Sequence, residues 1–263
     1  MKKLFQLMET NRARGPGLRA ESLGSEASLY LYDVIGYYGC EATDFVTLLA
    51  GIKADTIHLH INSPGGDVFE AVAIKQALIA HPARIIVHID GVAASAATIV
   101  MTAADEIQIA PEAFIMIHKC WAMAVGNADE LRSQADLQDK VDEALANVFV
   151  ARTGQALDQV LQWMLAETWF SAAEAVNFKF ADKIAVATSP NPQLPPDPVD
   201  PMPEARIAQP LARAVRFDLS SYHNVPAALT AGPHPAPSPD PVSALNQMHH
   251  HQLARLALYE RMA

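Results

Sequence analysis

Ser95 is the residue whose surroundings most suggest chemistry. It lies in Asp90-Gly-Val-Ala-Ala-Ser-Ala-Ala-Thr-Ile-Val-Met-Thr-Ala-Ala104, directly after an apolar run from Ile85 to Ile89. This pattern predicts a strand, a tight turn and a helix whose first turn carries the hydroxyl. A helix N-terminus offers unpaired N–H groups and the positive end of a dipole, which can stabilise an oxyanion. The alternative is that Ser95 only caps the helix.

Two other segments place polar groups at predicted strand ends. The segment Ile61-Asn-Ser-Pro-Gly-Gly-Asp-Val-Phe69 follows an alternating strand and precedes a predicted amphipathic helix from Val68 to His81. Its proline and glycines permit a turn that points bare N–H groups at a ligand, although a plain strand-to-helix turn has the same composition. His118 ends an apolar run of strand length that starts at Ala113, where it is either a base or an ordinary surface histidine.

Together these segments resemble the ClpP-type serine peptidases, the proteolytic subunit of the Clp protease, and in particular the phage and prophage branch that processes capsid components. The resemblance runs from about Tyr30 to Ile184, about three-fifths of the chain. It rests on the order and spacing of five motifs. They are Ser63-Pro-Gly-Gly66 with Val68, Gly91-Val-Ala-Ala-Ser95, Met116-Ile-His118, Thr153-Gly-Gln155, and Ser171-Ala-Ala-Glu-Ala-Val176 followed by Asp182.

The resemblance implies a role for each site residue. Ser95 matches the nucleophile, and His118 matches the general base that takes its proton and returns it to the leaving amine. The oxyanion hole would be formed by the backbone N–H groups of Gly66 and Ala96. The third member departs from the family, because Glu167 stands where an aspartate is usual. A glutamate can still hold the imidazole tautomer, but Glu167 could equally be a solvated loop carboxylate.

Composition excludes several functional classes. The 263 residues carry a formal net charge of −10 without a basic block, which argues against nucleic acid as a partner. Cys40 and Cys120 are far apart in a sequence without a signal-peptide pattern, so we expect free thiols and a cytoplasmic protein. Cys120 lies close to His118, but a cysteine nucleophile would need its own base and oxyanion turn. The sequence has no Cys-x-x-Cys pair and no apolar run of membrane-spanning length, so we expect no metal, no cofactor and no membrane contact.

Alternating strand and helix patterns predict an α/β fold with a largely parallel sheet. The family resemblance implies the ClpP/crotonase-like fold of repeated β-β-α units with a long projecting helix. That helix is expected from about Ala128 to Arg152, with a capping box at Asn127 and Glu130 and a C-terminal cap at Gly154. About 25 residues is long for a globular helix, so it would project and contact another subunit. In the family it joins two stacked heptameric rings; the alternative is a long helix at the edge of the core.

The sequence predicts three regions. Residues 1–27 read as a mobile N-terminal arm, residues 28–187 as the peptidase domain, and residues 188–263 as a largely disordered tail. Of the 18 prolines, 14 lie between Pro190 and Pro241, which is typical of extended spacers. Scattered apolar residues occur between two such spacers, from Ile207 to Leu229. Near-helical apolar spacing from Val242 to Met262 predicts a short amphipathic helix at the end.

The predicted function is a serine endopeptidase that forms a homo-oligomeric ring and acts on polypeptides, among them phage capsid or scaffold proteins during head maturation. Two other classes stay open. A crotonase-like acyl-CoA enzyme would use paired N–H groups without a Ser-His pair, and an inactive ClpP-like protein would serve as a scaffold or assembly factor. The sequence leaves open whether a Clp-type ATPase is a partner.

Overall fold

The computed structural model describes residues 6–7, 9–11, 17–185 and 217–230 of the chain. Its strands are β1 (Gly17–Leu23), β2 (Glu26–Tyr32), β3 (Thr56–Ser63), β4 (Arg84–Ala94), β5 (Glu106–Ile109), β6 (Phe114–Ile117), β7 (Thr168–Ser171) and β8 (Lys183–Ile184). Its helices are α2 (Ala42–Ala50), α3 (Val68–Ala80), α4 (Ala96–Met101), α5 (Ala128–Thr153), α6 (Leu157–Leu165), α7 (Ala172–Asn177) and α8 (Ala227–Thr230).

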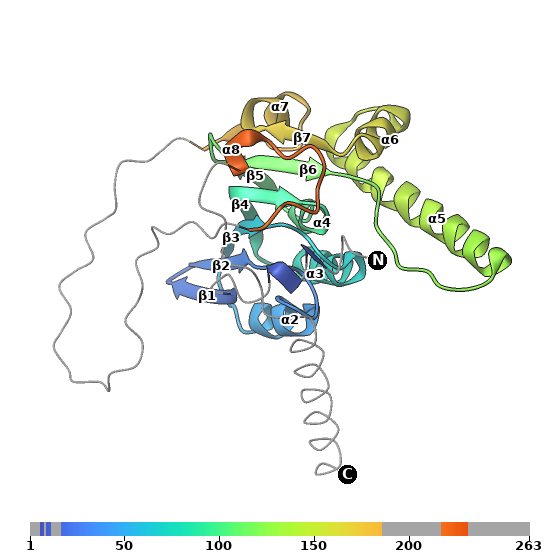
Figure 1. The fold of residues 1–263 in the computed structure, drawn as a ribbon. Coiled ribbons are helices and arrows are strands. Elements are labelled where there is room, and N and C mark those ends of the chain that lie inside the picture. The colour runs from blue at the N-terminus through green and yellow to red at the C-terminus, as the bar shows by residue number, and fades with distance from the viewer. Residues whose placement is uncertain (1–5, 8, 12–16, 186–216, 231–263) are drawn as a thin grey trace, which may run out of the picture. The chain divides into compact units, whose positions relative to one another are not determined.

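The strands form one mixed sheet that is largely parallel, as predicted (Figure 1). The main order is β1-β2-β3-β4-β5-β8, with antiparallel pairing only between β1 and β2 and between β6 and β7 among the described strands. Strand β4 changes partners along its length. Its first part pairs with β5, and its last residues, Val92–Ala94, pair with β6. The end of β4 and the end of β6 are therefore neighbours, which decides where the side chains that follow them lie.

The core lies on one face of the sheet, against α2, α3 and α4. Strand β3 alternates as the sequence predicts, β4 alternates within its predicted apolar run, and both strands bury apolar side chains at alternate positions before their ends. Those residues are Ile57, Leu59, Ile61, Ile85, Val87 and Ile89. Burying each such side chain stabilises the fold by about 1.5–3 kcal/mol, so this layer holds the strand ends in place. On the opposite face the same strands present stacked imidazole rings from His58, His60 and His88.

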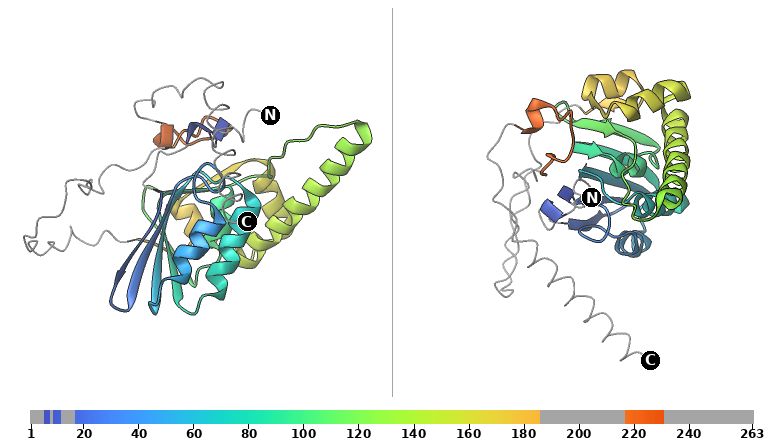
Figure 2. Two further views of the ribbon diagram at one scale, coloured as in Figure 1. Left: turned by 90° about the horizontal axis from the view of Figure 1, so that it is seen from below. Right: turned by 45° about the vertical axis from the view of Figure 1, so that its right-hand side comes forward.

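Helix α5 has the predicted caps, and only its second half is packed against the core. Asn127 and Glu130 form a capping box, and Gly154 ends the helix in the left-handed conformation. The buried side chains begin at Asp142, whereas every side chain from Ala128 to Lys140 is at least partly exposed. Figure 2 shows this first half extending past the sheet. No helix among the described residues combines the length and apolar composition needed to cross a membrane.

Two regions differ from the sequence prediction. The predicted arm over residues 1–27 contains β1, which pairs with β2 along its whole length. Within the predicted tail over residues 188–263, residues 217–230 pack on the domain, with Phe217, Leu219 and Tyr222 buried. The expected helix over Val242–Met262 lies outside the described residues.

Candidate active site

Ser95 lies at a sharp turn between β4 and α4. Its backbone has φ 54° and ψ −124°, which is unusual for a residue with a side chain. The Ser95 N–H donates to the carbonyl of Met116 at 2.9 Å, and this bond ties the turn to β6. The hydroxyl makes no capping bond to α4. The alternative that Ser95 is only a helix cap is therefore wrong, and the strained turn presents its Oγ to the side of the helix.

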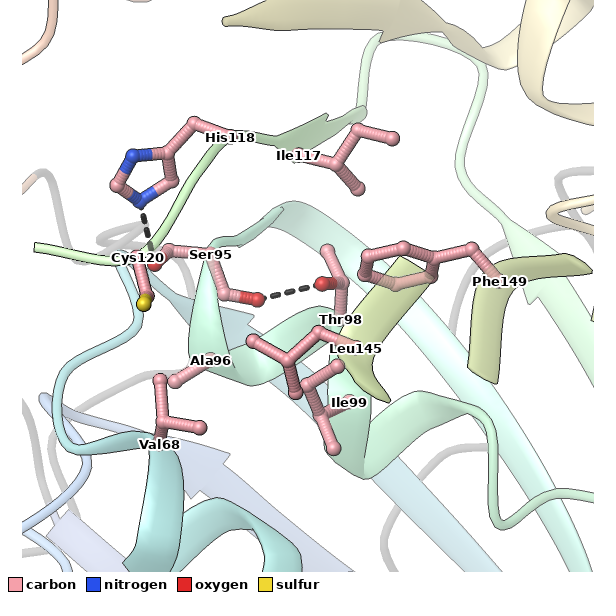
Figure 3. A pocket seen from close by; sticks show the side chains of 10 residues that line it. All are labelled: Val68, Ser95, Ala96, Thr98, Ile99, Ile117, His118, Cys120, Leu145 and Phe149. Carbon is pink, nitrogen blue, oxygen red and sulfur yellow. Dashed lines mark hydrogen bonds between the residues drawn. The ribbon is translucent and has the colours of Figure 1, made fainter. Parts of the chain in front are cut away.

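His118 follows the last residue of β6 and faces Ser95 (Figure 3). Ser95 Oγ and His118 Nε2 are 2.7 Å apart, a hydrogen-bond distance suited to proton transfer. The imidazole is 9% exposed and packs edge-on against Trp121, with ring centres 4.7 Å apart. The next residues are fixed from two sides: the Lys119 N–H donates to Met164 O, and the Cys120 N–H donates to Asp142 Oδ1 of α5.

The Gly65–Gly66 turn lies against the Ser95 turn. A Cβ on Gly65 would lie 2.8 Å from Ser95 Cβ and 3.0 Å from Ala96 N, so only glycine allows this approach. Gly66 forms a parallel bridge with Ile35, in which Ile35 bonds to Gly65 O and to the Asp67 N–H. Because a residue in such a bridge bonds to only one side, the Gly66 N–H is directed away from Ile35. The turn thus brings the two predicted oxyanion-hole residues, Gly66 and Ala96, to the same place beside Ser95.

Glu167 directly precedes β7, just as His118 directly follows β6. In the antiparallel pair β6 and β7, Ile117 lies opposite Thr168, so the next positions along are His118 and Glu167. Glu167 has φ 51° and is only 7% exposed. Its Oε1 accepts hydrogen bonds from the backbone N–H groups of His223 and Asn224, the latter at 2.9 Å. Glu167 is thus a buried, hydrogen-bonded carboxylate and not a solvated one; its role as the triad acid stays a prediction.

Two cavities open beside the catalytic pair. A small apolar one of about 20 Å³ lies next to Ser95 (Figure 3) and is lined by Val68, Thr98, Ile99, Ile117, Leu145 and Phe149. A larger one of about 150 Å³ reaches Ser95 and His118 and has Gly66, Val68, Trp121 and Tyr222 in its walls. An apolar pocket beside a nucleophile and an adjoining groove suit a side chain and a stretch of polypeptide.

Cys120 lines both cavities but does not suit a nucleophile. Burial, followed by its hydrogen bond to Asp142, raises the pKa of the Cys120 thiol to about 12, so it is protonated at neutral pH. Cys40 is buried and also a free thiol. Among the described residues, no group of three His, Cys, Asp or Glu side chains is arranged to hold a metal ion.

The remaining motif residues support the fold rather than the chemistry. Ser171 and Glu174 form a capping box at the start of α7. Asp182 accepts from the Ile107 N–H and pairs with Arg152 of α5 at 2.8 Å, which joins three elements. The capping box fixes the start of α7, which directly follows β7.

Sequence reasoning missed Trp121 and Tyr222. Both contact the His118 ring, with centres 4.7 and 5.4 Å away. Tyr222 lies in an apolar island, Phe217-Asp-Leu-Ser-Ser-Tyr222, between proline-rich spacers. This apolar island was the signal in the sequence that could have revealed Tyr222. Apolar residues inside a spacer need a surface to pack against, even where they follow no regular period.

Known proteins resemble this chain over the same region. Residues 39–188 match the Clp protease family. The ATP-dependent Clp protease proteolytic subunit 1 of Leifsonia xyli subsp. xyli is 32% identical over 145 residues, covering 54% of this chain and 74% of that protein. The proteolytic subunit 2 of Tropheryma whipplei is 30% identical over 132 residues, covering 49% and 73%.

A solved structure agrees with the fold. A ClpP1 variant from Listeria monocytogenes superimposes with a TM-score of 0.54 at 22% identity, covering 60% of this chain and 90% of the other. The matched region contains the Ser95 turn, the glycine turn and His118. The chain belongs to the Clp protease family of serine-type endopeptidases and has its α/β fold with a mixed sheet and a long helix.

Proposed function

We propose that this protein hydrolyses peptide bonds with Ser95 as nucleophile and His118 as general base. The observation that carries the proposal is the 2.7 Å contact between Ser95 Oγ and His118 Nε2 at a strained turn. His118 takes the hydroxyl proton as Oγ attacks the scissile carbonyl, then gives it to the leaving amine. Water activated in the same way hydrolyses the acyl-enzyme and restores Ser95.

The N–H groups of Gly66 and Ala96 stabilise the oxyanion that forms in each step. Their support is the contact between the Gly65–Gly66 turn and the Ser95–Ala96 turn. Fixed backbone donors need no reorganisation during the reaction, and removing one such donor costs about 10²–10³ in rate in a well-studied serine protease. Glu167 stabilises the imidazolium from the position opposite His118 in the strand register.

The substrate is polypeptide, and the working unit is a ring of subunits. Family membership supports both. Large apolar side chains are exposed in the loop before α5 and along its first half, namely Met123, Val125, Leu131 and Leu137. Such a concentration of exposed apolar side chains is typical of a protein interface. We propose that this segment, residues 119–140, joins copies of the chain and encloses the active sites.

A more specific prediction concerns the natural substrate. Phage capsid or scaffold proteins are the expected substrates, and independence from a Clp-type ATPase is the expected mode of action. Incubation of the protein with casein and with a capsid or scaffold protein, with and without an ATPase, decides both. Cleavage of casein alone would contradict the head-maturation role.

The test of the activity uses Ser95→Ala. The wild-type chain should hydrolyse a fluorogenic peptide and react with a fluorophosphonate probe, and the variant should do neither while keeping its oligomeric mass. Loss of the hydroxyl costs little stability because it makes no capping bond. A wild-type chain that neither cleaves nor reacts would favour the inactive scaffold. Acyl-CoA turnover that persists in Ser95→Ala would favour the crotonase-like enzyme.

A further inference from the structure

Residues 217–224, the strap, lie across the end of the sheet that carries the catalytic pair. In Figure 1 this segment runs beside β6 towards α8. Phe217, Leu219 and Tyr222 are buried in a second apolar cluster that is separate from the main core. The domain contributes Leu7, Val92, Ala94 and Met116 to that cluster. Three of these four residues come from β4 and β6, the strands that end at Ser95 and His118.

A second contact ties the strap to the other end of the chain. Asn11 is fully buried, its side-chain N–H donates to Asp218 O at 2.8 Å, and its Oδ1 accepts from the Asp218 N–H. The described residues 6–7 and 9–11 lie next to this segment (Figure 2). The two hydrogen bonds between Asn11 and Asp218 and the burial of three large side chains stabilise the strap on the domain. They argue against a segment that is easily displaced from the site.

Tyr222 fixes the strap to both catalytic turns. Its hydroxyl donates to Pro64 O at 2.6 Å, one residue before the glycine turn. Its ring packs edge-on against His118 and lies 5.2 Å from Trp121, so two aromatic rings confine the imidazole. Burial raises the pKa of Tyr222, which keeps the hydroxyl a neutral donor. The histidine ring thus has few orientations other than the one that reaches Ser95.

The two residues after Tyr222 hold Glu167. The N–H groups of His223 and Asn224 both donate to Glu167 Oε1, and the Asn224 side chain donates to Ala166 O at 2.8 Å. A glutamate has one more rotatable bond than an aspartate, so a carboxylate on this longer side chain needs more restraint to stay aimed. Two amides on one oxygen supply that restraint and leave the other oxygen for a different partner.

We infer that the strap is a positioning element of the active site, in which Tyr222 orients His118 and the His223 and Asn224 amides orient Glu167. The inference rests on the proposed peptidase function. It makes residues 217–224 part of the working enzyme, although a long proline-rich stretch separates them from the rest of the domain in sequence.

The test compares His223→Pro with His223→Ala in the full chain. Proline removes the N–H that donates to Glu167, whereas alanine keeps it and removes only the side chain. We expect His223→Pro to lower kcat by about tenfold or more with KM changed less than about threefold, and His223→Ala, which keeps the N–H, to lower kcat much less. Unchanged or increased kcat in His223→Pro would overturn the inference, and an increase would identify the strap as an inhibitory plug.

Tyr222 gives an independent pair of variants in case His223→Pro does not fold. Tyr222→Phe keeps the ring beside His118, and Tyr222→Leu removes it. We expect Tyr222→Leu to lose kcat and Tyr222→Phe to restore most of it; equal activity in the two variants would contradict ring positioning.

A measurement that does not depend on catalysis distinguishes failure of this inference from failure of the proposed peptidase function. The NMR signals of the His118 ring, assigned with His118→Gln, should move in Tyr222→Leu and should move further in His223→Pro than in His223→Ala. Signals that do not move overturn the positioning role. A wild-type chain that is inactive although these signals move contradicts the peptidase function alone.

Discussion

At the scale of single residues, the site depends on backbone strain as much as on side chains. Ser95 and Glu167 have positive φ, which is strained for a residue with a side chain, whereas the positive φ of Gly65 is one that glycine adopts freely. Strain of this kind persists only where surrounding contacts determine it. Here those contacts are the Ser95 N–H bond to Met116, the glycine turn packed on Ser95, and the strap amides on Glu167.

Replacing Gly65 should damage the site through a clash. In Gly65→Ala the new Cβ would lie 2.6 Å from Ala94 O and 2.8 Å from Ser95 Cβ, at φ +92°. We expect a loss of about 1–3 kcal/mol in the free energy of unfolding and a large fall in kcat, because Ser95 must move. Gly24→Ala is the control, since it also has positive φ but no atom within 4 Å of the added Cβ. Equal activity in the two variants, measured with urea unfolding and peptide hydrolysis, would show that the close approach is unimportant.

Glu167→Gln tests the triad acid. Glutamine keeps an oxygen for the strap amides but loses the charge that stabilises the imidazolium. We expect kcat to fall by a large factor, up to about 10⁴ as for other triad acids, with little change in KM. Glu167→Asp keeps the charge and should be more active than Glu167→Gln. Full activity in Glu167→Gln would indicate a Ser95–His118 dyad.

The sequence predicted the residues of the site better than their supports. Ser95, His118 and the glycine turn could be found because their motifs are local: each is a strand end with a polar or glycine residue at a fixed offset. Tyr222 could not be found in this way, since its contacts with Pro64 and His118 bridge more than 100 positions. Nothing in the residues around it predicts which surface it covers.

At the scale of elements, periodicity and caps predicted well wherever an element carries its own signals. Helix α5 begins and ends at its predicted caps, β3 alternates as expected, and β4 forms where the apolar run was predicted. Strand β1 was missed because it is an edge strand with Arg19 and Glu21 in its sequence, which reads as polar loop. The structure gives Arg19 a partner across the hairpin, since its guanidinium lies 3.9 Å from the centre of the Tyr30 ring.

The histidine stack on β3 and β4 should make stability depend on pH. Burial, followed by the nearby His60 and His58, lowers the pKa of His88 to about 4, while Asp90 and Glu106 act in the opposite direction. A histidine with a pKa below its unfolded value of about 6.5 binds fewer protons when folded, so stability is retained above that pH and falls as the pH drops towards 4. We expect a loss of no more than about 2 kcal/mol, allowing for the partial exposure of the ring.

The measurement is urea unfolding of wild type and His88→Gln between pH 4.5 and 8. The difference between the two proteins should stay constant above pH 7 and shift in favour of the variant below pH 6. Taking this difference removes the contribution of other groups, such as Asp33, whose pKa burial raises to about 6. Parallel curves over the whole range would show that His88 does not titrate in this way.

At the scale of the whole molecule, the domain combines segments that are far apart in the chain. Residues 6–7 and 9–11, the sheet and residues 217–230 meet at the end of β4 and β6, so both flanks of the region that matches the family contribute to the proposed active site. Helix α5 differs from these segments, because part of it is not packed against the domain. Its packed half begins at Asp142, next to the loop that follows His118. In its exposed half, Gln138 donates to Cys120 O and Asp139 pairs with Lys119, whereas Leu131 and Leu137 are exposed. A contact between copies at these leucines would lie close to the loop that carries Cys120.

Leu131→Glu tests whether that exposed half joins subunits. Leu131 lies in the exposed first half of α5, it is 43% exposed, and it does not line either cavity. A charge at an apolar interface is costly to desolvate, so we expect a smaller mass in size-exclusion chromatography with light scattering, and lower peptidase activity that follows the mass. Arg132→Glu places a negative charge on the same helix, on the side away from both Leu131 and Leu137, and should assemble like wild type. An unchanged mass in both variants would show that α5 does not form the contact between copies, whereas a loss of mass in both would point to charge on the helix rather than to the apolar face.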